Sequence, residues 1–594
     1  MKRHTLLFLI LFPLHMALPQ QPTIHYSLGM SQPSTHLFEV ELRCEKIGGG
    51  PETIDFILPV WRPGRYVLLE FAGGIQGFSA YDGDDKPLSW SKTDKATWRV
   101  SAGKANEVTI RYKVYANEFN LSTRGLNDEH AFVDGSAVFM YAERFRKLPL
   151  QLTVKPFGLW HVTTGLEGSG KEFSAPDYDY LVDCPLEIGN QKDFPFSVEG
   201  VPHVLSIYGD GNWNPDTLTR DIGKIVSAQK SLWGQFPYKR YVFLLHCTSS
   251  GGGGTEHINS TIMGSRAYIF KNPDSYRGFL GLVSHEYFHT WNVKQLRPKG
   301  IHPYDYTKEN YSEELWIAEG TTSYFDVLML VRSGFMQVDK YLEQIASGVQ
   351  GDRQRPGNSA QSVAEASFDA WVKYWKGAEQ SNNFETDYYD KGSMVSFLLD
   401  IDIRQRTQNA RSLDDVMRTM YNRYPLSGAG YTLSDFQKVS EELAGGSLKK
   451  YFDDYVYGTA QLPWEEYLLR AGLLLAPKDS VQKTWLGVGT TDAGDKTRVT
   501  RVTAGSPGYA AGLDLGDEIL ALDGSRVRTN DLNDRIAERK PGDKVTLTVF
   551  HNDRLKEIRV TLGSAPVPAY KLVKIPAPTP LQKSIYEGWL KTTW

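Results

Sequence analysis

The spacing of hydrophobic positions changes twice along the chain. Between residues 22 and 200, apolar and polar residues alternate in short runs, as at 36–42, 108–115 and 150–154. Alternation with a period of two is typical of half-buried antiparallel strands. From about residue 215 the spacing becomes helical, and helical patterns dominate to about residue 458 except for a buried strand at 241–246. Residues 484–563 return to short strands, with glycines and one short helix.

These changes predict a multidomain α+β protein. We expect an all-β N-terminal domain at 22–200, a mostly helical domain at 201–475 and a small third domain at 483–564. The tail, 565–594, begins with a proline-rich stretch that is typical of a linker or an extended strap. A chain of 594 residues is long enough for three or more domains of about 100–200 residues each.

The composition excludes several classes of protein. Apolar residues make up 41% and charged residues 23%, as in ordinary globular proteins. Lys and Arg number 66 against 70 Asp and Glu, a net charge of −4, so the chain has no basic excess for binding nucleic acid. Three scattered cysteines are too few for a disulfide framework.

The first 19 residues have the features of a secretory signal peptide. Lys2 and Arg3 precede an apolar run at 6–14. This run is too short to cross about 30 Å of hydrocarbon as a helix, so we expect no transmembrane anchor. An uncleaved signal anchor is the alternative. Export to a bacterial periplasm or to the medium is the resulting expectation.

The strongest chemical signal is the segment from His285 to His289, His-Glu-Tyr-Phe-His, within an apolar helical pattern. Residues four apart lie on one helix face, so both imidazoles can reach one metal ion. Glu286 is rotated by about 100° around the helix from His285, where it can serve as a general base without being a ligand. Two imidazoles, a third ligand and an open position are typical of catalytic zinc.

A third ligand must come from further along the chain. Six residues between 302 and 319 have suitable side chains: His302, Asp305, Glu309, Glu313, Glu314 and Glu319. Glu319 is favoured because it lies in an otherwise apolar stretch, 315–320, where an unpaired carboxylate would be costly. We therefore predict one Zn²⁺ per chain, held by His285, His289 and Glu319.

The zinc motif followed by Trp-x-x-Glu-Gly at 316–320 resembles the gluzincin metallopeptidases. Segments 289–298, 253–257, 58–66 and 127–132 resemble the glycyl aminopeptidase family, and the resemblance extends from about residue 23 to 563. Thr255 departs from the leucine expected there. The resemblance implies a thermolysin-like catalytic domain and an aminopeptidase that prefers small N-terminal residues, glycine and alanine.

The resemblance also implies two further roles. Glu256, at the end of the glycine-rich segment, matches the carboxylate that binds the substrate's free α-amino group, with Gly253, Gly254 and His257 beside it. Glycines let backbone approach a substrate closely. Tyr389 matches the tyrosine that stabilises the oxyanion, and Tyr388 is the competing assignment.

Residues 486–524 resemble a PDZ domain. Such domains bind an extended C-terminus by strand addition, and the peptide carboxylate is held by a loop that corresponds here to Leu486, Gly487 and Val488. A structural module packed on the peptidase is the alternative.

Together these observations predict an exported zinc aminopeptidase that acts on peptides with a free N-terminus, with Glu286 as base and Tyr389 as oxyanion donor. Two alternatives stay open. One is an endopeptidase with the same zinc chemistry, and the other is a peptide-binding scaffold with a vestigial site.

Overall fold

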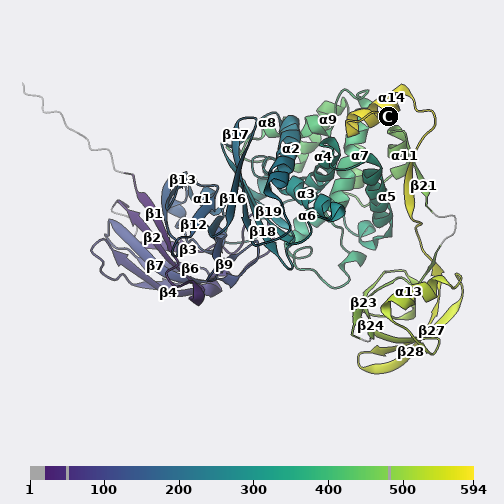
Figure 1. Ribbon diagram of the computed structural model, residues 1–594, viewed down its shortest axis with the longest axis horizontal. Coiled ribbons are helices and arrows are strands. Elements are labelled where there is room, and N and C mark those ends of the chain that lie inside the picture. The colour runs from purple at the N-terminus through teal and green to yellow at the C-terminus, as the bar shows by residue number, and fades with distance from the viewer. Residues whose placement is uncertain (1–20, 49–51, 479–482, 495) are drawn as a thin grey trace, which may run out of the picture.

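The computed structural model describes residues 21–48, 52–478, 483–494 and 496–594. The predicted signal peptide, residues 1–19, therefore lies outside the described residues. The β-rich N-terminal part, the helical part and the part that resembles a PDZ domain, called the PDZ domain below, occupy different regions of an elongated molecule (Figure 1). The expected fold class, a multidomain α+β protein, is confirmed.

The N-terminal domain consists mainly of three sheets. The largest has seven strands in the order β13-β14-β11-β1-β2-β7-β4. Their bounds are Glu167–Ser169, Glu172–Ala175, Leu150–Lys155, Thr23–Gly29, Leu37–Glu45, Glu107–Tyr115 and Ile75–Asp82. Along β2 the side chains of Phe38, Val40, Leu42 and Cys44 are buried and those between them are more exposed, as the alternating pattern predicts.

A five-stranded and a three-stranded sheet complete this domain. The first has the order β12-β15-β10-β9-β8, with bounds His161–Thr164, Leu186–Gly189, His130–Val133, Arg124–Leu126 and Asn117–Glu118. The second has the order β3-β6-β5, with bounds Thr53–Ile57, Thr97–Ser101 and Trp90–Lys92.

The part that carries the His285–His289 motif, which the resemblance predicts to be catalytic and which is called the catalytic domain below, begins with a mixed sheet in the order β16-β17-β18-β20-β19. The bounds are Lys192–Val198, Val201–Tyr208, Tyr241–Thr248, Ser260–Arg266 and Gly254–Glu256. Because β16 pairs along its whole length with β17, it belongs to this sheet, although the sequence pattern placed it before the boundary at 200. The short strand β19 lies at the edge of the sheet.

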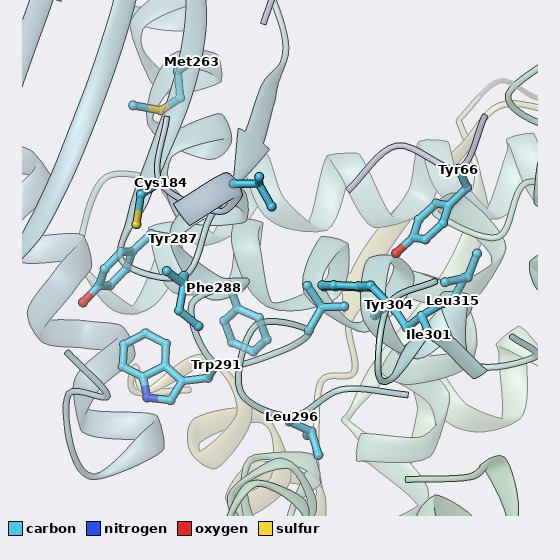
Figure 2. Close-up of a cluster of buried hydrophobic side chains, with 14 of the residues drawn as sticks. Tyr66, Cys184, Met263, Tyr287, Phe288, Trp291, Leu296, Ile301, Tyr304 and Leu315 are labelled. Carbon is cyan, nitrogen blue, oxygen red and sulfur yellow. The ribbon is translucent and has the colours of Figure 1, made fainter. Parts of the chain in front are cut away.

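Helices pack beside this sheet (Figure 1). They are α2 Pro215–Trp233, α3 Pro273–Phe288, α4 Thr322–Arg332, α5 Val338–Gln354, α6 Val363–Phe368, α7 Asp390–Arg406, α8 Leu413–Arg423, α9 Leu433–Ala444, α10 Lys449–Tyr455 and α11 Trp464–Arg470. Aromatic side chains at the end of α3 lie in the core, among them Tyr287, Phe288 and Trp291 (Figure 2). Phe288 stacks on Phe325 of α4 with ring centroids 5.0 Å apart, which fixes these two helices against each other.

The PDZ domain has its own hydrophobic core, separate from the core that the first two domains share. Its main sheet has the order β23-β24-β25-β27-β28, with bounds Val488–Ala493, Lys496–Val502, Glu518–Leu522, Lys544–His551 and Arg554–Thr561. Helices α12 and α13 span Pro507–Ala511 and Thr529–Ala537. The Asn383 side chain joins this domain to the catalytic domain, donating to Val502 O and accepting from Ala504 N, both at 2.9 Å.

The proline-rich tail returns to the catalytic domain. Its strand β30, Tyr570–Lys574, pairs with β21, Leu473–Pro477, and its helix α14, Pro580–Leu590, contacts α4, α7 and α11. The PDZ domain is thus tied to the catalytic domain at both of its ends. No helix within the described residues combines the length and apolar character needed to cross a membrane.

Candidate active site

The two histidines of the motif project from the end of α3. Asn272 caps this helix, accepting bonds from the amides of Asp274 and Ser275, and Pro273 occupies its first turn. His285 lies in the last turn and His289 is the C-cap residue. Their Nε2 atoms are 3.1 Å apart, so the i and i+4 spacing places both imidazoles at one point, as the sequence predicts.

Glu319 reaches the same point from another element. It lies in a π-helical segment, Trp316–Thr321, that runs directly into α4. Its Oε2 is 3.2 Å from His289 Nε2 and 3.6 Å from His285 Nε2. A π-helical turn rather than the expected regular helix carries this residue, and such turns are frequent at functional sites. Asn292 fixes the segment by donating from Nδ2 to the carbonyl oxygen of Ile317 at 2.8 Å.

The spacing of these three side chains fits a zinc ion. Ligand atoms about 2.0–2.1 Å from a tetrahedral ion lie roughly 3.3 Å from one another, and the three separations here are 3.1, 3.2 and 3.6 Å. The imidazoles oppose the effect of burial and lower the pKa of Glu319, which keeps the carboxylate ionised. The second ring nitrogen of each histidine also has a partner. His285 Nδ1 lies 2.9 Å from Asp326 Oδ2, and His289 Nδ1 lies 3.0 Å from Asn292 O. These contacts hold the two rings in their orientation.

A second cluster of metal-ligand types has a different geometry. His130, Glu187 and His246 lie close together where β10 and β15 meet β18. The Glu187 oxygens are 2.9 Å from His130 Nδ1 and 2.6 Å from His246 Nε2. These are hydrogen-bond distances, shorter than the spacing around a tetrahedral zinc ion. This cluster is a hydrogen-bonded link between the two domains.

Glu286 lies next to the three predicted ligands and is 5% exposed. Burial raises the pKa of this carboxyl to about 7, although the two histidines oppose the rise. Its carboxylate packs against the backbone of β19, since a Cβ on Gly254 would lie 2.5 Å from Glu286 Oε1. A carboxylate that titrates near neutrality is suited to accept and return a proton.

Glu256 lies at the end of the edge strand β19 and is 4% exposed. One of its oxygens, one of Glu286 and a nitrogen of His289 all lie within 4.8 Å of one another. Within the described residues, the Glu256 carboxylate has no side-chain hydrogen bond and no ion pair. A buried carboxylate without a partner is costly, so this one has the charge and position to receive a cationic group.

The other residues expected around Glu256 have distinct positions. Gly253 has a φ of +75°, which favours glycine, and Gly254 gives Glu286 room. His257 instead belongs to a buried polar group, since its Nδ1 is 3.1 Å from Asp183 Oδ1 and Lys294 donates to the same oxygen at 2.8 Å. These contacts are typical of a histidine with a structural role.

Tyr389 and Tyr388 differ in what their side chains contact. The Tyr389 ring stacks beside His285, with centroids 6.3 Å apart and an angle of 21° between the planes. Tyr388 is fully buried, and its hydroxyl accepts a hydrogen bond of 2.9 Å from Trp375 Nε1. Of the two, Tyr389 lies beside the predicted ligand His285, and its hydroxyl has no hydrogen-bond partner within the described residues.

The N-terminal domain supplies residues to this site that sequence reasoning missed. Arg62 donates from Nη1 to Thr255 Oγ1 at 3.1 Å, which accounts for a threonine at this position. Gly64 lies directly against Glu256, because a Cβ there would be 2.7 Å from both carboxylate oxygens. Segment 61–65 is rich in Trp, Arg, Pro and Gly, but this composition by itself indicates only a turn and does not show that the segment reaches Glu256. Asp326 and Asn292 were also missed, since nothing local marks a residue that orients a ligand.

Several features of the loop at Leu486, Gly487 and Val488 are consistent with a carboxylate-binding loop. Gly487 has a φ of +81° and lies over Ser506, leaving no room for a side chain. Leu486 is buried, Val488 begins β23, and β23 lies at the edge of its sheet. Among the described strands, none pairs with the outer edge of β23, and an unpaired edge is what strand addition requires.

Comparisons with known proteins agree with this architecture. The chain matches the family models for the peptidase M61 N-terminal domain at 25–190, the M61 glycyl aminopeptidase at 278–395 and the PDZ domain at 484–562. A solved structure of an aminopeptidase N family protein from Idiomarina loihiensis is 28% identical, with a TM-score of 0.88, over 96% of this chain and 100% of that one.

Two other proteins are similar to part of this chain. An M1 zinc metallopeptidase from Deinococcus radiodurans is 12% identical, with a TM-score of 0.46, over 76% of this chain and 97% of that one. A curated relative, a probable periplasmic serine endoprotease DegP-like protein from Rhizobium meliloti, is 30% identical over 123 residues. That match spans 18% of this chain and only 23% of the relative's length.

The matched N-terminal, peptidase and PDZ models follow one another along most of the chain, and the structural relative covers nearly all of it. The chain therefore belongs to the M61 glycyl aminopeptidase family of peptide hydrolases and carries a C-terminal PDZ domain.

Proposed function

We propose that the protein is a zinc-dependent aminopeptidase that removes the first residue of peptides with a free N-terminus. The observation that carries this proposal is Glu256, a buried carboxylate without a partner within the described residues, a few ångströms from Glu286 and His289. An ammonium group bound there would place the first peptide bond beside the metal ligands. One zinc ion per chain, held by His285, His289 and Glu319, accompanies this proposal.

Each side chain then has a chemical role. Zinc, when bound, supplies a Lewis acid that polarises the peptide carbonyl and favours deprotonation of water. Glu286 accepts the proton of the attacking water and returns it to the leaving amine, which a pKa near 7 favours. The Tyr389 hydroxyl donates a hydrogen bond to the developing oxyanion. The edge of β19, with which no further strand pairs within the described residues, aligns the substrate backbone.

The experiment that tests this proposal uses pairs of substrates that differ only at the N-terminus. Glu256→Gln keeps the shape of the side chain and removes its charge. A charge-assisted hydrogen bond is worth about 1.5–3 kcal/mol, so kcat/KM on free-amine peptides should fall by roughly ten- to a hundred-fold. N-acetylated peptides should be cleaved poorly by both proteins.

A matched control is Glu313→Gln, which changes an exposed carboxylate before the Glu319 segment. Its activity and zinc content should equal those of the wild type. If the wild type cleaves an N-acetylated peptide as fast as its free-amine counterpart, the endopeptidase alternative is correct. If purified protein binds no zinc and cleaves neither peptide, the scaffold alternative is correct.

We also propose small first residues, glycine and alanine, as preferred substrates, and export of the protein to the periplasm or the medium. Family membership supports the first. The signal-like start of the sequence supports the second, together with a curated relative whose name includes the word periplasmic. Binding of a peptide C-terminus by the PDZ domain is supported by the loop at Leu486, Gly487 and Val488 and by the position of β23 at the edge of its sheet.

A further inference from the structure

A cleft lies between the catalytic domain and the PDZ domain, and none of the roles assigned above uses it. Its volume is about 780 Å³, within the range that is typical of ligand sites. Helices α4 and α5 and the start of α7 line it on the catalytic side, and Trp485, Arg501 and Thr503 line it on the PDZ side. Helix α5 and the PDZ domain lie toward the same end of the molecule (Figure 1). Two domains therefore contribute to one site.

The PDZ side of the cleft is held in place by Asn383 of the catalytic domain. The Asn383 side chain donates to Val502 O and accepts from Ala504 N, both at 2.9 Å. Arg501 directly precedes Val502 in the chain. These hydrogen bonds therefore fix the end of the strand that carries Arg501 against the catalytic domain.

The cleft extends to the neighbours of two catalytic groups. Asp326 lines the cleft, and its Oδ2 is 2.9 Å from Nδ1 of the predicted ligand His285. Asp390 and Lys391, which directly follow Tyr389 in the chain, line the cleft as well. Since the Tyr389 ring stacks beside His285, the cleft begins next to a metal ligand and the proposed oxyanion donor.

A substrate bound as proposed above directs its remaining residues toward this cleft. Glu256, which would hold the ammonium group, lies with Glu286 and His289. The cleft instead reaches the side of His285 and Tyr389. An extended chain advances by about 3.3–3.6 Å per residue, so the residues that follow the first peptide bond lead away from Glu256 and past the metal ligands. The cleft lies in that direction.

The α5 wall of the cleft leaves room for a polypeptide chain. Ser347, Gly348 and Gly351 line the cleft, and their spacing of three and four positions places them on one helix face. A Cβ on Gly351 would have no atom within 4 Å. Serine, asparagine and glutamine side chains make up much of the remaining lining, and such groups can form hydrogen bonds with a peptide backbone.

The positive groups of the lining differ in whether they have a partner. Lys391 donates to Asp352 at 2.5 Å, and Arg355 Nη1 is 3.8 Å from Asp387 Oδ2. Arg501 is exposed, and within the described residues its guanidinium group forms no ion pair and no hydrogen bond. A carboxylate of a substrate in the cleft can therefore pair with Arg501 without displacing another carboxylate.

We propose that this cleft holds the part of the peptide that follows the first peptide bond, and that Arg501 binds a carboxylate of that part. The inference rests on the proposed aminopeptidase function. It deepens that function by naming the substrates as peptides of several residues with a negative group beyond the cleaved bond. It also gives the PDZ domain a direct part in binding them.

The first test compares alanine p-nitroanilide with alanyl peptides, from the dipeptide to the hexapeptide, on the full-length, zinc-loaded protein. For the wild type, kcat/KM should rise with peptide length. Arg501→Glu should lower kcat/KM on the longer peptides by roughly three- to tenfold, the scale for reversing the sign of a partly exposed charge pair. It should leave alanine p-nitroanilide, which has no second residue, unchanged. Arg498→Glu is the matched control and should change neither, because this exposed residue of the same strand does not line the cleft.

The source of the carboxylate is tested with three versions of the hexapeptide. One has a free C-terminus, one is amidated, and one is amidated with a glutamate before its last residue. A loss in Arg501→Glu on the first supports a C-terminal carboxylate, and a loss on the third supports an acidic side chain. An equal loss on the neutral amidated peptide, or no loss on either peptide that bears a carboxylate, would overturn the role of Arg501.

Gly351→Phe tests the cleft without changing a charge. Its ring would occupy the open space at the α5 wall, so kcat/KM on the hexapeptide should fall by about tenfold or more, because a ring and a peptide chain cannot share this space. Alanine p-nitroanilide should be cleaved as by the wild type. Gly278→Phe is the control, at an exposed position of α3 where a Cβ also has open space. If a melting curve shows that Gly351→Phe does not fold, Gly351→Leu replaces it. An unchanged dependence on peptide length in the folded, zinc-loaded variant would overturn the proposal.

The proposed function fails in a different way. If the wild type cleaves neither alanine p-nitroanilide nor any of the peptides, the aminopeptidase proposal is wrong. If it cleaves the dipeptide and the hexapeptide equally well, and neither substitution changes this, the enzyme is an aminopeptidase and only the role of the cleft is wrong.

Discussion

Glu286 lies against Gly254 beside the metal ligands, and its loss should separate chemistry from metal binding. Glu286→Gln keeps the size of the side chain and leaves all three ligands in place. Activity should fall by at least ~10²-fold, the usual scale for general-base catalysis, while zinc content measured by atomic spectroscopy stays at the wild-type level. Full activity in this variant would remove Glu286 from the mechanism.

The two adjacent tyrosines offer a matched pair at the same scale. Tyr389→Phe removes the hydroxyl that faces the ligands, and turnover should fall by roughly 10²–10³-fold. KM should change little, because this hydrogen bond strengthens only in the transition state. Steady-state kinetics provide the check.

Tyr388→Phe is the control for that measurement. Its hydroxyl accepts from Trp375 inside the core, so stability should fall while turnover stays close to the wild type. If Tyr388→Phe loses turnover while Tyr389→Phe stays active, Tyr388 and not Tyr389 is the oxyanion donor.

At the scale of elements, helix α14 closes the core of the catalytic domain. Trp589 is fully buried, with its ring 5.1 Å from that of Phe397, and its carbonyl oxygen accepts from Arg332 at 3.0 Å. Trp589→Ala should reduce the free energy of unfolding of this domain by about 3–5 kcal/mol. Urea unfolding followed by circular dichroism would measure the loss.

Trp589→Phe should cost less than the alanine variant, since it retains an aromatic ring in the packed position. An unchanged unfolding midpoint in Trp589→Ala would show that the tail is not part of the folded catalytic domain.

At the scale of the whole molecule, Glu187 links the N-terminal domain to the catalytic sheet through His130 and His246. Burial alone would raise the pKa of Glu187, but the two histidines lower it to about 2. A carboxyl whose pKa is below its unfolded value of about 4.3 stabilises the fold fully above that pH. This contribution is lost as the pH falls from about 4.3 toward 2.

Glu187→Gln should therefore reduce stability by about 3–5 kcal/mol at pH 7, the scale for breaking a buried pair. The difference from the wild type should shrink below pH 4. Thermal melts between pH 3 and 7 are the measurement, and Glu167→Gln, which changes an exposed residue of the same domain, is the control. A difference that is equal at pH 3 and pH 7 would contradict the charge-based explanation.

The sequence by itself predicted the order of the domains and the three side chains that the structure groups at the candidate zinc site. Alternation along β2 and helical spacing along α3 are local properties, because each depends only on which residues are two or four positions apart. The prediction that His285 and His289 lie on one helix face follows from the same spacing. Glu319 was identified because a carboxylate among apolar residues needs a partner, which is again visible locally.

The surroundings of the centre depended on contacts between residues far apart in the chain. Asp326 orients His285 because α4 packs on α3, and Gly64 reaches Glu256 across almost two hundred residues because the N-terminal domain packs on β19. Strand β16 pairs with the sheet that follows it rather than with the preceding domain, and the tail returns to β21. Which strands pair depends on how whole faces of sheets and helices are buried, and a local sequence pattern does not show this. Only the tertiary structure therefore decided which residues complete the site.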